Sequence, residues 1–66
     1  MAMLQLNNKI YTKEAVLKAV YDFTGLCTIK FDEVEKYYQL EFEDCKCGEE
    51  RTMKEFENYV VGIENL

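Results

Sequence analysis

Residues 26–43, LCTIKFDEVEKYYQLEFE, decide the fold, because they contain two runs in which apolar and polar residues alternate. Side chains along a strand point alternately to the two faces of a sheet, so each run predicts a strand with one buried face. The polar segment EVEKY between them predicts a β-hairpin. The residues expected on the buried face are Cys27, Ile29, Phe31, Tyr38, Leu40 and Phe42.

One helix is predicted before this hairpin and another after it. The first begins after Thr12, a good N-cap, and ends at Gly25, because glycine commonly follows a helix C-terminus. The second begins near Thr52, which forms a capping-box pattern with Glu55. Both have an apolar stripe at helical spacing: Ala15, Val16, Ala19, Val20 and Phe23 in the first, and Met53, Phe56, Tyr59, Val60 and Ile63 in the second.

A short strand is predicted at the N-terminus, because MLQL (Met3–Leu6) also alternates. A right-handed crossover through the first helix makes the first two strands parallel with a gap between them, which the third fills antiparallel to both. We therefore predict a single α+β domain over residues 1–66, with order β-α-β-β-α and strand order 1-3-2. Both helices lie on one face, as in a ferredoxin-like fold that lacks its last strand.

The composition narrows the classes of function. The chain has 13 acidic and 8 basic residues, a net charge of −5, which argues against a nucleic-acid backbone or an anionic membrane surface as partner. No apolar run approaches the roughly 18 residues of a membrane span. The start, MAMLQLNN, has neither a basic region nor a long apolar region. We therefore expect a cytoplasmic protein that binds neither nucleic acid nor membranes.

No catalytic residues are visible in the sequence. The chain contains no histidine and no serine, so neither a Ser/His nor a Cys/His couple can form. Asp32, Glu33 and Glu35 are expected in the hairpin loop, and other acids on a solvated strand face. Carboxylates act as acid and base only in a cleft that separates their pKa values. We predict a protein that is not an enzyme and has no cofactor.

The segment DCKCGEE, Asp44–Glu50, offers an alternative function. Cys45 and Cys47 would belong to a small metal- or redox-handling protein, and thiol titration with zinc or copper(I) would test this. The strand alternation instead places Cys27 in the core and the other two thiols at the rim, which argues against a three-thiol metal site. Neighbouring acids oppose thiolate formation. The favoured interpretation is three reduced cysteines and a plain loop.

The first strand is the candidate site for interactions. In the predicted order it has an unpaired edge, with neither a proline nor a charged side chain to protect it. Such an edge pairs with an added strand, either from a peptide or partner protein or from a second copy in a homodimer. The residues of this edge are Met3, Leu4, Gln5, Leu6 and Asn7.

The run KIYTKEAVLKAVYDFTG, residues 9–25, resembles the start of the small HxsD-type proteins of His-Xaa-Ser systems, and the similarity extends over residues 8–60. Matching positions are Tyr11, Thr12, Glu14, Ala15, Lys18, Ala19, Tyr21 and Phe23, with EFENYV at the start of the second helix. The resemblance implies a protein encoded beside radical-SAM enzymes and a peptide with His-Xaa-Ser repeats. Because the chain lacks a Cys-x3-Cys-x2-Cys cluster, the resemblance implies a non-enzymatic accessory in peptide maturation.

Overall fold

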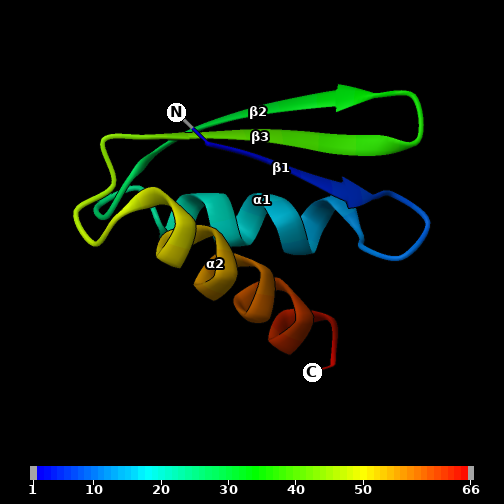
Figure 1. The fold of residues 1–66 in the computed structure, drawn as a ribbon. Coiled ribbons are helices and arrows are strands. Elements are labelled where there is room, and N and C mark those ends of the chain that lie inside the picture. Colours follow the sequence, from blue (N-terminus) through cyan, green and yellow to red (C-terminus); the bar gives the residue numbers. More distant parts are fainter. Residues whose placement is uncertain (1, 66) are drawn as a thin grey trace.

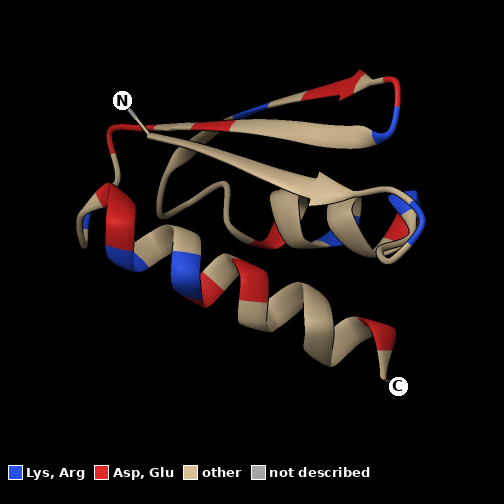
Figure 2. Ribbon diagram, turned by 45° about the vertical axis from the view of Figure 1, so that its right-hand side comes forward, with Lys and Arg blue, Asp and Glu red and all other residues tan. Residues whose placement is uncertain are grey.

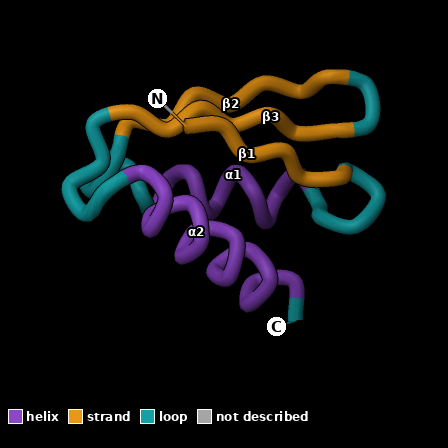
Figure 3. The backbone as a smooth tube through the Cα atoms, in the orientation of Figure 1, coloured by secondary structure: helices purple, strands orange, loops and turns teal. Residues whose placement is uncertain are grey.

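The computed structural model describes residues 2–65, and it confirms the predicted β-α-β-β-α order (Figure 1). The five elements are β1 (Ala2–Asn7), α1 (Lys13–Asp22), β2 (Thr28–Val34), β3 (Tyr37–Glu43) and α2 (Glu49–Glu64). The strands form one sheet with the order β1-β3-β2, as predicted. Both helices lie on the same side of this sheet, which gives two layers (Figure 3).

The central strand β3 pairs antiparallel with both neighbours, so β1 and β2 are the two edges of the sheet. Leu40 of β3 lies opposite Leu4 of β1 and opposite Phe31 of β2. These three residues form a row on the face that the helices cover. The neighbouring row on the outer face contains Met3, Glu41 and Lys30.

The core lies between the sheet and the two helices. Phe56 of α2 is fully buried and packs edge-to-face against Phe42 of β3 and Phe23 after α1, with ring centroids 5.3 Å apart in both pairs. Such aromatic pairs stabilise a fold by about 0.5–1.5 kcal/mol beyond their burial. The predicted inward phase of β3 is confirmed, because Tyr38, Leu40 and Phe42 are all buried. Ile29 and Phe31 of β2 are partly buried and pack against the same core.

Two predicted helix boundaries are wrong. The helix α2 begins at Glu49, one turn before the predicted capping box, and its N-cap is Gly48 with a φ of 89°. Thr52 is instead buried inside the helix, where its hydroxyl donates to the Gly48 carbonyl at 2.7 Å. The helix α1 ends at Asp22, and Gly25 lies in the following turn without a positive φ.

The N-terminus of α1 is as predicted, and it has an additional partner. The Thr12 hydroxyl accepts a hydrogen bond from the Ala15 amide at 3.3 Å, as an N-cap does. The amide and hydroxyl of Thr12 also donate to the Glu64 carboxylate at 2.6 and 2.8 Å. A carboxylate is favourable at this end of a helix dipole, so the last turn of α2 is fixed to the start of α1.

Candidate interaction site

The outer edge of β1 presents unpaired backbone groups. Within residues 2–65, β1 pairs only with β3, in a register that places Leu4 opposite Leu40 and Leu6 opposite Tyr38. In an antiparallel pair, successive residues point their amide and carbonyl groups alternately toward the partner strand and away from it. Half of the β1 backbone therefore faces away from the sheet.

One hydrogen bond beyond the strand identifies which half. The Asn8 amide donates to the Lys36 carbonyl at 2.8 Å and continues the register of β1 and β3. Because the pattern repeats every two residues, the backbone groups of Leu6 and Leu4 also hydrogen-bond to β3. The amide and carbonyl groups of Met3 and Gln5 therefore point outward, into the position where a fourth strand would pair.

The predicted edge residues are not equivalent. Met3 is 47% exposed and Gln5 is also exposed, whereas Leu4 is half-buried and Leu6 is part of the core. Asn7 closes one end of the edge, because its carbonyl accepts hydrogen bonds from the amides of residues 10 and 11. The strand also begins earlier than predicted, at residue 2. The usable edge is centred on Met3 and Gln5.

Charges are distributed unevenly over the two edges of the sheet. In Figure 2, β1 has no charged residue along its whole length, whereas β2 has both signs. Glu33 of β2 pairs with Lys13 of α1 at 3.4 Å. Glu33 and Asp32 were predicted in the hairpin loop, which is wrong, because β2 continues to residue 34 and the turn contains only Glu35 and Lys36. This two-residue turn makes β2 longer than the polar composition of EVEKY indicated.

The cysteines differ from their prediction. Cys27 is buried, as expected, but it forms a disulfide with Cys45, so the expectation of three reduced thiols is wrong. Cys45 was predicted at the outer rim by extending the alternation of β3. Asp44, with a φ of 54°, interrupts that alternation and turns Cys45 toward the core side. Cys47 is free and exposed, as predicted.

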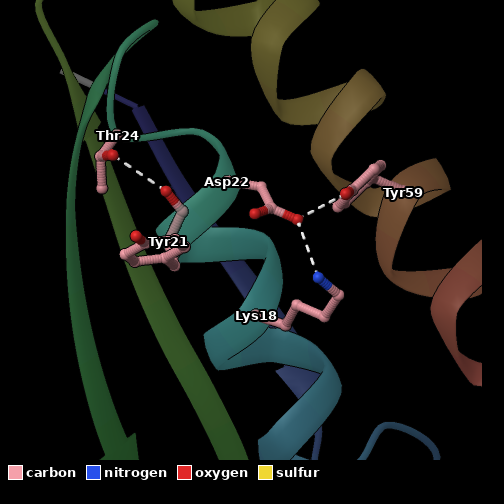
Figure 4. Close-up of polar contacts among 5 residues, drawn as sticks. All are labelled: Lys18, Tyr21, Asp22, Thr24 and Tyr59. Atoms are coloured by element: carbon pink, nitrogen blue, oxygen red, sulfur yellow. Dashed lines mark hydrogen bonds and ion pairs between the residues drawn. The ribbon is translucent and has the colours of Figure 1, made fainter.

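A polar cluster on the surface joins the two helices (Figure 4). The Tyr59 hydroxyl of α2 donates to the Asp22 carboxylate of α1 at 2.5 Å, and Lys18 lies 3.4 Å from the same oxygen. The hydrogen bond from Tyr59 is the main cause that lowers the pKa of Asp22, and the hydrogen bond and charge of Lys18 add to it. The Tyr59–Asp22 bond also raises the pKa of Tyr59. All three groups are solvated, so the cluster is a structural contact between helices.

Other kinds of site find little support. Within residues 2–65, no three His, Cys, Asp or Glu side chains are grouped so that they could hold a metal ion. Over the same residues, none of the helices combines the length and apolarity needed to span a bilayer. An open depression near the start of α2 is lined by residues 47–51 and Lys54, and none of these belongs to β1.

Comparison with known proteins identifies the family. The family model described as "His-Xaa-Ser system protein HxsD" matches residues 6–64. No curated protein and no solved structure matches the chain. The family match begins at Leu6, so Met3 and Gln5 lie before the matched residues. The match nevertheless spans all of both helices and the hairpin, and the chain belongs to the HxsD family of His-Xaa-Ser system proteins.

Proposed function

We propose that this protein is a non-enzymatic accessory of a His-Xaa-Ser system, and that it binds an extended segment of a partner along the outer edge of β1. The observation that supports this most is the pair of outward-facing residues, Met3 and Gln5, on a strand without a charge. Membership of the HxsD family supports a role inside a system of several proteins.

The edge provides both hydrogen bonds and apolar contact. Each hydrogen bond to an added strand contributes a net of about 0.5–1.5 kcal/mol, and the two residues together offer two donors and two acceptors. Leu4 and Ala2 are half-buried on the inner face and pack against the core. An added strand whose alternate side chains are apolar would cover them, so we expect a partner segment with that alternation.

A second copy of the chain is another candidate occupant of the same edge. Around a two-fold axis through Leu4, the outward groups of Met3 in one copy would bond to those of Gln5 in its twin. The sheet would then contain six strands. Because each chain carries a net charge of −5, charge repulsion opposes this homodimer, and we favour a partner protein or peptide.

The alternative function, a metal- or redox-handling protein that uses Cys45 and Cys47, has less support. Cys45 is bonded to Cys27 and not to Cys47. We also propose that the protein is cytoplasmic, as the sequence predicts. Fractionation of the native cell would test this location.

The test compares two variants at one position. Gln5→Pro removes an outward donor without removing a bond to β3, whereas Gln5→Thr keeps the donor and suits a strand. Binding is measured to a radical-SAM enzyme and to a His-Xaa-Ser peptide, the two partners that the family resemblance implies, with sedimentation as the assay of self-association. We expect Gln5→Pro to weaken binding at least tenfold and Gln5→Thr to change it less than twofold. Equal binding by both variants, with both folded by circular dichroism, would exclude the edge.

A further inference from the structure

Two cysteines that are distant in sequence lie together at one end of the sheet. Cys27 precedes β2 and is 5% exposed, whereas Cys45 follows β3 and is half-buried. They are bonded across a sequence separation of 18, which encloses the whole hairpin. The proposed binding edge on β1 uses neither residue.

The backbone keeps these sulfurs adjacent by contacts that do not involve the S–S bond. The Lys46 amide donates to the Leu26 carbonyl at 3.0 Å, which joins the residues next to both cysteines. Asp44 turns the chain so that Cys45 faces Cys27, and the first residue of β2 is paired with the last of β3. Because none of these contacts involves a sulfur atom, we expect them to hold the two thiols of a reduced chain close enough to react.

We infer that Cys27 and Cys45 form a reversible dithiol–disulfide site that reacts with small disulfides such as oxidised glutathione. The Cys45 thiolate, the more accessible of the two, attacks one sulfur of the small disulfide, forms a mixed disulfide and releases one small thiolate. The Cys27 thiolate then attacks the Cys45 sulfur and releases the second. The protein loses two electrons and two thiol protons, and the small disulfide becomes two thiols.

Closing this bond changes the stability of the hairpin and of the loop that leads into α2. A crosslink over a loop of this length restricts the unfolded chain, so the oxidised form should melt higher, by on the order of 10 °C. Cys47 is exposed and unpaired, and in this proposal the bond forms without it. The site therefore links the stability of the fold to the thiol–disulfide balance around it.

The experiment uses the full chain carrying Cys47→Ser, incubated in glutathione buffers from fully reduced to fully oxidised. Intact mass should show the loss of two hydrogens in oxidising buffer, reversal in reducing buffer, and a higher melting temperature for the oxidised form. Adding Cys45→Ser should leave a single thiol and prevent the loss of hydrogens. Stable glutathione adducts on both Cys27 and Cys45, or equal melting temperatures in both buffers, would overturn the inference. The mass of the Cys47→Ser chain alone decides it if the further variant does not fold.

Discussion

The two edges of the sheet, β1 and β2, have the same geometry and opposite chemistry. Each pairs with β3 on one side and points alternate backbone groups outward on the other. The sequence of β1, AMLQLN, has no charge, whereas β2, TIKFDEV, contains Lys30, Asp32 and Glu33. Figure 2 shows this contrast directly, with a β1 that is tan throughout and a β2 that has both blue and red segments.

This difference is the reason why we propose β1, and not β2, as the binding edge. Natural proteins protect exposed edges with charged side chains, because an unprotected edge pairs with other chains. Two of the three charges of β2 are held in ion pairs, Lys30 with Glu43 at 3.8 Å and Glu33 with Lys13 at 3.4 Å. Each exposed pair contributes little to stability. The charges make β2 a poor template for pairing, which supports β1 as the proposed edge for a partner.

The largest effect should come from proline at Leu4, because its amide bonds to β3 and its side chain is half-buried. Leu4→Pro should cost about 3 kcal/mol of unfolding free energy, whereas Gln5→Pro should cost much less. Urea unfolding followed by circular dichroism measures both. If Gln5→Pro were the more destabilising variant, the Gln5 amide and not the Leu4 amide would be the one that bonds to β3, which would contradict the assignment.

The second effect compares proline on the two edges. In the hairpin, Val34 and Tyr37 flank the two-residue turn as a hydrogen-bonded pair, so the Glu33 amide points outward as the Gln5 amide does. Glu33→Pro should leave partner binding within twofold of wild type, in contrast to the loss expected for Gln5→Pro. Titration of the partner with each variant gives the two dissociation constants. Similar losses of partner affinity in both variants would show that the partner does not distinguish β1 from β2.

The third prediction concerns variants that add a charge to β1 and remove the charges of β2. Met3→Lys adds a charge to β1 and should weaken partner binding by about tenfold, equivalent to about 1.4 kcal/mol. A β2 variant with Lys30→Thr, Asp32→Thr and Glu33→Thr should begin to self-associate, because threonine suits an uncharged strand. Sedimentation of this variant beside wild type measures the gain. A monomeric β2 variant would show that charge is not what protects this edge.

The smallest effect concerns the helices under the sheet. The pKa of Asp22 is lowered in the folded protein, so its contact with Tyr59 stabilises the fold above about pH 4 and is lost as the pH falls through the lowered value. Asp22→Asn should therefore lower the melting temperature slightly at pH 7 and have less effect at pH 3. Partner binding should not change. A tenfold loss of binding in Asp22→Asn would mean that the helix layer contributes to the interaction.

The order of elements and the strand pairing could be predicted because they follow from long-range patterning. Alternation in the hairpin and the helical stripes each determine one buried face, and few topologies bury all of them together. The unpaired edge of β1 follows from that topology. It was therefore predictable from Met3–Leu6 without any sign of a partner.

The errors arose where single residues change the backbone direction. The positive φ of Asp44 interrupts the alternation of β3, and no composition signal marks it, so the pairing of Cys45 with Cys27 was missed. At the start of α2, Thr52 and Glu55 form a good capping box, yet the helix begins at Glu49 because the Thr52 side chain is buried and bonds to Gly48 instead. Tertiary burial outweighed the local capping preference in that case.

Residue-resolved amide exchange tests the central claim most directly. In the free protein, the Met3 and Gln5 amides should exchange rapidly, while the Leu4 and Leu6 amides, bonded to β3, exchange slowly. With a proposed partner bound, either a radical-SAM enzyme or a His-Xaa-Ser peptide, the Met3 and Gln5 amides should become protected at least tenfold, and the Glu33 amide on β2 should not change. Protection at Glu33 with unchanged exchange at Met3 and Gln5 would contradict the assignment of β1 as the binding edge.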